Sequence, residues 1–469
     1  FNSDGAPGET LNGGQFTNSA SIGGQAGSDG MTGPYGVDGS SGSAGANGPM
    51  LTLTSPPSDP SVIDGGNGTA GGNGDAGGTG GPGGTGGAGI SGASVIIGNE
   101  VGGTIAGGVG GNGGAGGQGG FGGFGGNGGD AGFAEVYDGE NYLPGAYGTA
   151  GVGGAGGNGG AGGNGGNGGH GGAGISGTNL GILNYGLIAG GNGGLGGVGG
   201  EHGFGGVGGM GGYGLTTPVD GARGLDGFAA GTAGLDGNGG PGIALTGGSD
   251  NVVTNMPGGR ILGGAGGGTT GTGGDGILVS GGTAIIVNGG TISGGQGGTS
   301  YGIRVAAGGT VALLVNAQGG NTPLTYHGAL PQNYQVIVQS PDNYGRLVVT
   351  SPSGRMAFGI AQESTPVIGT TYAAVLEGVD AGSLESVTGV ADNFAWTLLD
   401  PEIDGIWDLF VRQRGPDAAN TLLGLQANSG AVRSVLSQRA AATTFALDND
   451  CSVFDTYGLC VSVGFRTSQ

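Results

Sequence analysis

Residues 190–214 read GGNGGLGGVGGEHGFGGVGGMGGYG, and from Leu195 to Tyr213 every non-glycine residue except His202 falls on a three-residue period. The same register recurs in the runs 112–130 and 158–173. A polyproline-II backbone turns once in about three residues, so a Gly-Gly-X run places every X side chain along one edge. The two bare edges allow neighbouring backbones to approach and to exchange N–H···O=C hydrogen bonds.

The composition distinguishes this chain from other glycine-rich proteins. Glycine supplies 137 of 469 residues, whereas hydrophobic residues make up 35% and charged residues only 9%. Collagen requires glycine at every third position with abundant proline, but this chain has 18 prolines and mostly Gly-Gly-X triplets. A flexible linker would place serine at X and show no period. The pattern therefore predicts a polyglycine-II-like bundle.

A single run of this kind is not stable alone. Ordering each residue costs about 1–2 kcal/mol, whereas a hydrogen bond between runs returns about 0.5–1.5 kcal/mol. We expect the runs to pack together, with help from apolar X residues and from neighbouring subunits. The candidates for this assembly role are Leu195, Val198, Phe204, Val207, Met210, Tyr213, Phe121 and Phe124.

Strand-like segments interrupt the glycine runs. Units that begin at Ile90 and Ile175 share Gly-Ile-Ser-Gly, and looser copies begin at Ile243 and Ile277. In each unit β-branched residues alternate with small polar ones, as stacked β-solenoid rungs require. The predicted fold class is therefore mainly β with extended glycine-rich helices, in which β-solenoid rungs are interleaved with a polyglycine-II-like bundle.

The composition changes at each predicted domain boundary. Residues 1–64 predict an extended N-terminal segment or a flexible tail, and residues 65–320 the glycine runs with their rungs. Ordinary glycine content and six alternating segments in 321–415 predict a β-sandwich-like domain or a solenoid cap. An apolar 3.6 period predicts a helical linker over 416–446. Residues 447–469 contain Cys451 and Cys460, whose spacing predicts a disulfide hairpin, with free thiols as the alternative.

Charge and motifs restrict the function. The net charge of −22 and the ten basic residues predict no nucleic-acid partner, and no apolar run is long enough to span a membrane as a helix. His170, His202 and His327 have no ligand spacing, and the G-x-S-x-G match at Ser300 lies in a repeat where chance matches are expected. We therefore expect no catalytic, cofactor or metal site and no enzyme, although calcium at turns such as Asp275 is an open alternative.

Two segments carry a family resemblance. Residues 447–466 (LDNDCSVFDTYGLCVSVGFR) and the rung 281–294 (GGTAIIVNGGTISG) resemble the passenger region of bacterial autotransporters, without the translocator barrel. The resemblance implies a location outside the cell or at the surface of a Gram-negative bacterium. It also implies adhesion, aggregation or matrix formation.

Two hypotheses for function follow. The first is a secreted structural protein that forms a homo-oligomer or homopolymer as an extracellular fibre or surface layer. The alternative is a monomeric, stalk-like adhesin that binds a cell-surface, matrix or glycan ligand.

Overall fold

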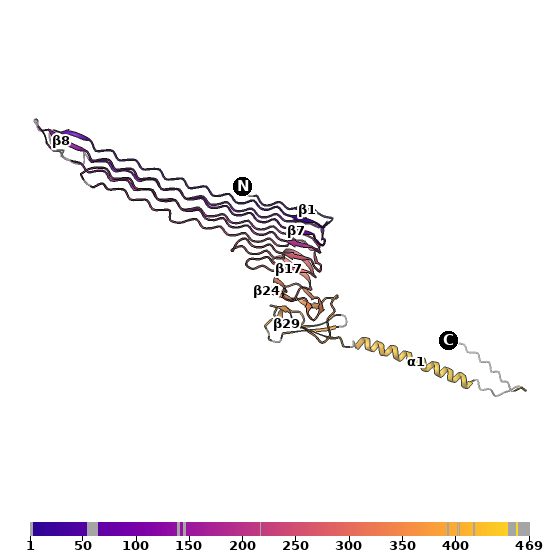
Figure 1. Ribbon diagram of the computed structural model, residues 1–469. Coiled ribbons are helices and arrows are strands. Elements are labelled where there is room, and N and C mark those ends of the chain that lie inside the picture. Colours follow the sequence, from indigo (N-terminus) through magenta and orange to yellow (C-terminus); the bar gives the residue numbers. More distant parts are fainter. Residues whose placement is uncertain are drawn as a thin grey trace.

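The computed structural model describes residues 3–53, 64–137, 141–143, 147–215, 217–391, 394–400, 402, 404–415, 418–448 and 456–457. It consists of a long slab of glycine-rich chain, a stack of β-strands at one end of the slab, and a projecting helix (Figure 1). The predicted disulfide pair, Cys451 and Cys460, lies outside the described residues.

The strands stack in parallel, rung upon rung, on three faces. The first face contains β1 (Glu9–Asn12), β5 (Ile90–Ala93), β10 (Ile175–Thr178), β13 (Ile243–Gly247), the start of β16 (Ile277–Asn288), β18 (Ile303–Val305), β20 (Leu324–Ala329) and β24 (Leu347–Ser353). The second contains β2 (Gln15–Asn18), β6 (Ile96–Asn99), β11 (Gly181–Asn184), β14 (Asn251–Asn255), the end of β16, β19 (Gly309–Asn316), β21 (Asn333–Val336) and β25 (Ala357–Ile360). The third contains β3 (Ser21–Gly23), β7 (Thr104–Ala106), β12 (Leu187–Ala189), β15 (Arg260–Leu262) and β17 (Thr291–Ser293). These parallel sheets are compatible with a β-solenoid.

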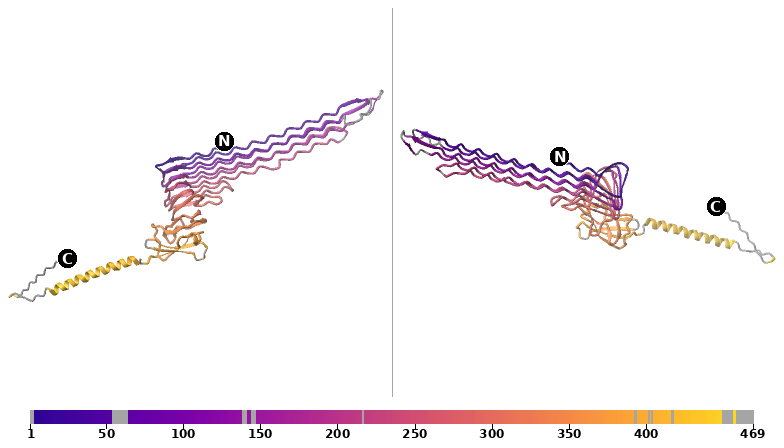
Figure 2. Two further views of the ribbon diagram at one scale, coloured as in Figure 1. Left: turned by 180° about the vertical axis from the view of Figure 1, so that it is seen from behind. Right: turned by 45° about the horizontal axis from the view of Figure 1, so that its top comes forward.

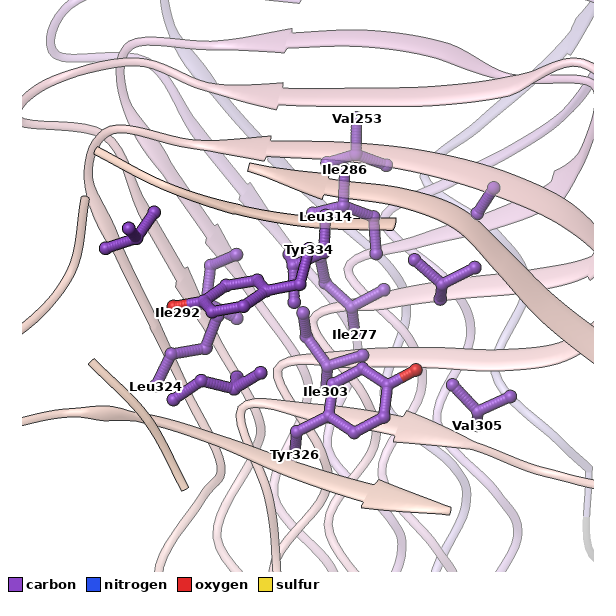
Figure 3. Packing of buried hydrophobic residues seen from close by; sticks show 14 of the residues in the cluster. Val253, Ile277, Ile286, Ile292, Ile303, Val305, Leu314, Leu324, Tyr326 and Tyr334 are labelled. Atoms are coloured by element: carbon purple, nitrogen blue, oxygen red, sulfur yellow. The ribbon is translucent and has the colours of Figure 1, made fainter. Parts of the chain in front are cut away.

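One hydrophobic core runs through the stack because equivalent residues of successive rungs lie in register. Ile90 pairs with Ile175 on the first face, and Ile182 pairs with Val253 on the second. Figure 3 shows how the core widens toward later rungs, where Tyr326 and Tyr334 replace the aliphatic side chains. The alternation of inward β-branched residues with outward polar ones therefore sets the strand register.

A ladder of buried asparagines follows the corner between the second and third faces. Each Nδ2 donates to the Oδ1 of the next asparagine at 2.8–3.1 Å, in the order Asn18, Asn99, Asn184, Asn255, Asn288 and Asn316. The same amides also bond to backbone carbonyls at the turn, for example Asn184 Nδ2 to Gly186 O at 3.2 Å. Sequence analysis missed this ladder, although an asparagine at the end of each second-face strand is visible in the sequence.

Residues 321–415 differ from the antiparallel sandwich that we predicted. Strands β20, β21, β24 and β25 continue the parallel stack, and their side chains belong to the same core. Antiparallel pairing appears only at the end, in β26 (Thr371–Glu377), β27 (Thr388–Ala391), β28 (Phe394–Leu399) and β29 (Ile406–Gln413). The segment therefore matches the alternative of a solenoid cap, because its first strands find a parallel edge to extend.

The remaining elements are short or peripheral. β22 (Val338–Ser340) pairs with β23 (Asn343–Tyr344), and η2 (Ala381–Ser383) is a single turn. At the far end of the slab, β4 (Met50–Leu53) pairs with β8 (Phe133–Tyr137), which pairs with β9 (Tyr142–Leu143). Helix α1 (Ala418–Asp448) covers the predicted helical linker and projects away from the strands (Figure 2).

The glycine runs leave the stack between the third and first faces as hairpins. Each hairpin has an outbound and a return rod: 24–48 with 64–89, 107–132 with 148–174, and 190–214 with 217–242, followed by the short hairpin 263–276. Outbound rods lie beside outbound rods, return rods beside return rods, and the two layers face each other (Figure 1). We call this two-layer body the glycine slab.

The three positions of a Gly-Gly-X triplet face three directions. In the triplet 116–118, Gly116 N–H donates to Val198 O of the next outbound rod, and Gly117 N–H donates to Gly78 O of a return rod, both at 2.8 Å. The third residue, Gln118, faces solvent. Every interior rod is thus held by hydrogen bonds on two sides and displays its X side chains on the third.

Interior glycines are required because no Cβ fits between the rods. A Cβ at Gly116 or Gly117 would overlap the carbonyl oxygen of Gly163 or Pro34, closer than the 3.0 Å that real Cβ atoms respect. The glycine hydrogen in that direction points at the same oxygen, so the close approach also adds a Cα–H···O contact. Backbone packing, rather than turn geometry, therefore explains most of the glycine content.

The rods at the two edges of the slab need only one glycine per triplet. In 24–48 glycine occurs as Gly-X-X, and from 221 to 237 it is again single. Rod 24–48 bonds to only two other rods, through Gly30 N–H to Asn112 O and through Gly72 N–H to Ser40 O. The change from Gly-Gly-X to Gly-X-X therefore records how many neighbours each rod has.

Candidate binding surface

All eight predicted assembly residues lie on the outer surface of the outbound layer, which we call the outbound face. The six from rod 190–214 form one line along the rod, because they occupy successive X positions. Phe121 and Phe124 lie on the adjacent rod, and the rings of Phe121 and Phe204 stack with centroids 5.9 Å apart. The exposed fractions of the eight residues range from 43% to 77%. We call these eight residues the apolar stripe.

The opposite surface of the slab, the return face, carries smaller side chains. Along rod 148–174 its X positions are mainly alanine and asparagine, with His170 near the strands. Its exposed large apolar side chains include Leu225 and Leu235 of the last return rod. The two faces therefore differ in chemistry although the same backbone lattice supports both.

Asparagine and aspartate at X positions bond to the neighbouring rod. The X residue N–H is the one amide of each triplet that the backbone pattern leaves free, and an Asx side chain on the preceding rod accepts it. Examples are Asn112 N–H to Asp29 Oδ1 at 2.7 Å and Leu195 N–H to Asn112 Oδ1 at 2.9 Å. On the return face Leu235 N–H donates to Asn167 Oδ1 at 2.9 Å. These polar residues are therefore lattice contacts within the slab, which sequence analysis missed.

Aspartates close the edge of the slab beyond the short hairpin. Gly196, Gly205 and Gly211 have no further outbound rod to donate to, and their N–H groups donate instead to Asp236, Asp226 and Asp220 at 2.8–2.9 Å. Asp236 also accepts Thr269 and Thr270 N–H, and the backbone N–H of Gly196, followed by that of Thr270, lowers the pKa of this carboxyl to about 2. The opposite edge carries side chains such as Pro34, which has no N–H. Side chains therefore block both edges against further rods.

His202, the residue out of register, lies opposite an extra residue in the partner rod. Gly224, Gly227 and Gly231 donate to Gly206, Gly203 and Gly200, so the return rod advances by four residues while the outbound rod advances by three. The inserted residue makes room for the His202 side chain at a position that is otherwise glycine. The imidazole packs edge-on against Phe204 with ring centroids 6.0 Å apart.

A polar cluster lies where the slab meets the strands. The Asp275 carboxylate, 10% exposed, accepts Arg304 Nε at 2.6 Å and Tyr301 N–H at 2.9 Å. The guanidinium lies over the Tyr301 ring, 4.8 Å from its centroid, and the ring stacks on His327 at 4.6 Å. Asp275 was the predicted calcium alternative, but here its oxygens are engaged by the arginine and the backbone.

The other residues that sequence analysis considered are separate from one another. His170 Nδ1 accepts Asn238 N–H at 2.8 Å, and His327 Nδ1 contacts Thr350 Oγ1 at 3.0 Å. Ser300 Oγ donates to Gly295 O at 2.5 Å. In the described part of the chain no group of three or more His, Cys, Asp or Glu side chains is placed to hold a metal ion.

No helix among the described residues is long and apolar enough to cross a membrane. No protein-family model matches the chain, and no curated protein is significantly similar to it. The function is therefore argued from the surfaces themselves.

Proposed function

We propose that this protein is a non-enzymatic adhesin of the cell exterior, with the glycine slab as a stiff arm of polyglycine-II type. The apolar stripe is its contact surface. The observation that carries the proposal is the exposure of eight large apolar side chains on one face of the slab. Contiguous apolar patches of this kind on soluble proteins mark sites of interaction.

The construction of the slab supports a role that does not depend on sister subunits. Interior rods donate two of the three N–H groups in each triplet to neighbouring rods of the same chain, as in 116–118. Asx side chains accept third amides, and aspartates occupy one free edge. A single chain therefore satisfies much of the hydrogen bonding that the sequence suggested a fibre would supply.

The stripe is preorganised for a broad, flat ligand. Its X residues repeat about every 9 Å along the rod, from three residues of about 3.1 Å each. Because the backbone lattice fixes their positions, binding costs little loop or domain ordering. The net charge of −22 disfavours polyanionic ligands, so an apolar or weakly polar cell-surface or matrix ligand fits best. The resemblance to autotransporter passengers is consistent with a location at the bacterial surface.

Adhesion of particles coated with the full chain tests this proposal. Each large side chain that becomes buried contributes on the order of 1–2 kcal/mol at about 25 cal/mol per Å². The triple variant Phe121→Ser, Phe204→Ser and Met210→Ser is therefore expected to bind alkyl-coated surfaces at least about tenfold more weakly. Its thermal stability should be unchanged, because X side chains face solvent.

The matched control places the same change on the return face. Leu225→Ser and Leu235→Ser remove exposed apolar side chains there and should leave adhesion unchanged. Equal loss of adhesion in both variants, or no loss in either, would refute the assignment of the stripe.

Self-assembly is the second candidate function, and the same stripe favours it. A stable interface buries about 800 Å² per partner, and a face of three rods, each about 70 Å long, has room for that area. Because side chains block both edges, growth by self-assembly would pair outbound faces rather than add rods. Sedimentation of the full chain over a range of concentrations decides between the candidates: oligomers that disappear in the triple variant support assembly, and monomers throughout support the arm.

A further inference from the structure

A cavity of about 370 Å³ lies at the base of the slab, beside the polar cluster of Asp275 and Arg304. Its walls come from three parts of the chain: Asn238 and Pro241 of the last long return rod, Thr272 of the short hairpin, and Leu278, Thr299 and Arg304 of the strand region. The volume falls within the range of about 300–1,000 Å³ typical of small-molecule sites. The cavity exists because the fourth hairpin is short and does not continue the layer.

Arg304 is fixed in the wall of this cavity. Its Nε is bonded to the buried Asp275 carboxylate at 2.6 Å, and its guanidinium plane packs on Tyr301. Tyr301 N–H bonds to the other Asp275 oxygen, and His327 supports the far side of the Tyr301 ring. The guanidinium therefore has one orientation before any ligand arrives, with its outer N–H groups at the cavity.

The other polar groups at the wall supply donors and acceptors. Asn238 Oδ1 accepts Thr272 N–H at 3.0 Å, which directs the amide group of this asparagine along the same wall. Within the described residues no protein partner is recorded for Asn238 Nδ2 or for the hydroxyls of Thr272 and Thr299. A planar guanidinium, an amide and two hydroxyls form a set that matches a molecule with several hydroxyl groups.

The charge balance indicates a neutral ligand. The carboxylate of Asp275 cancels the charge of Arg304, so the cavity offers directional hydrogen bonds with little net charge. The chain as a whole carries −22, which repels an anion at long range. A cation would meet the guanidinium. Pro241 and Leu278 add apolar surface opposite the polar groups, as the C–H face of a sugar ring requires.

We propose that this basal cavity binds a neutral saccharide unit, with Arg304, Asn238 and Thr272 as its hydrogen-bonding residues. The site is separate from the apolar stripe, and its occupancy does not depend on the function proposed for that surface. It adds sugar recognition at the base of the slab.

Titration of the full chain with monosaccharides tests the proposal. Glucose, galactose, mannose and N-acetylglucosamine serve as neutral probes, with glucuronate as the anionic and glucosamine as the cationic probe, followed by saturation-transfer NMR and calorimetry. At least one neutral sugar should bind more tightly than both charged probes. Arg304→Lys keeps the charge but loses the planar fork, and Thr272→Val loses one hydroxyl, so each should weaken that binding at least about tenfold.

Matched controls keep the result interpretable. Arg223→Lys alters the exposed pair with Asp226 on the last return rod, and Thr79→Val alters an X position of the first return rod, so both should bind sugar like the parent chain. Absence of binding by every neutral probe, tighter binding of glucuronate or glucosamine, or equal effects of test and control variants would overturn the proposal. Adhesion to alkyl surfaces is measured separately, so failure at one surface does not imply failure at the other.

Discussion

Substitution of one interior glycine tests the backbone packing of the slab. In Gly163→Ala the new Cβ would overlap Gly78 O of the neighbouring return rod, so the two rods must separate locally. Gly77 N–H to Ala161 O at 2.9 Å and Gly80 N–H to Asn164 O at 2.8 Å join these rods on either side, and Gly163 N–H bonds to Gly117 O at 2.8 Å.

The loss of these three bonds sets the expected magnitude. Each is worth about 1 kcal/mol, and the lower unfolded-state entropy of alanine offsets about 0.5–1 kcal/mol of the loss. The slab should therefore lose about 2 kcal/mol, which corresponds to a roughly 30-fold rise in hydrogen exchange of its amides. Hydrogen exchange of peptides from 68–84 and 151–174 measures this directly. Tryptophan fluorescence would not, because Trp396 and Trp407 lie in the cap.

Gly66→Ala provides the matched control. Its Cβ would lie 3.0 Å from Ala46 N, beside the edge rod, and Thr69 and Asp75 already carry side chains at the equivalent position of the same rod. Exchange should change little in this variant. If Gly163→Ala protected the amides as well as the parent chain, the claim that backbone contacts exclude a side chain there would be wrong.

Three further predictions concern the ladder, the edge and the irregular triplet. Asn184→Ala leaves buried amide partners on Asn99 and Asn255 without a bond, so we expect a loss of about 2–4 kcal/mol in denaturant unfolding, against a smaller loss for Asn18→Ala at the end of the ladder. The folded pKa of Asp236, about 2, lies below the ordinary 3.8, so its stabilisation of the 263–276 hairpin is complete above about pH 4 and is lost as pH falls through 2. Proteolysis of that hairpin by an acid-active protease should show this dependence in the parent chain and not in Asp236→Asn, whereas Asp38→Asn should behave as the parent. Deletion of Ala229 alone should destabilise the slab by forcing His202 against the return rod, and His202→Gly should restore stability in the double variant, as thermal melts of the four proteins can show.

The repeat in the sequence predicted much of the architecture. Alternating β-branched residues in the units at Ile90, Ile175, Ile243 and Ile277 indicated parallel rungs, and the rungs begin at these residues. The apolar 3.6 period indicated the helix that the structure places at Ala418–Asp448. These patterns were readable because a strand and a helix each impose a fixed side-chain period.

Other features were not predictable from one sequence. The parallel extension of β20 to β25 depends on an edge that earlier rungs provide, so their local alternation fits a sandwich equally well. The cluster of Asp275, Tyr301 and His327 joins residues from different rungs. The Asx contacts link residues 83–85 positions apart, a separation that only the hairpin lengths determine.

The sequence by itself determined that glycine recurs every third residue, that large apolar residues share one edge of rod 190–214, and that His202 breaks the register. These are local properties of a threefold backbone. Only the tertiary structure decided which rods touch, which glycines must lack a Cβ, and why triplets change from Gly-Gly-X to Gly-X-X at the edges. The physical reason is that a glycine rod has almost no side chains to encode its partners. The lengths of the hairpins and the stacked rungs at their base choose those partners instead.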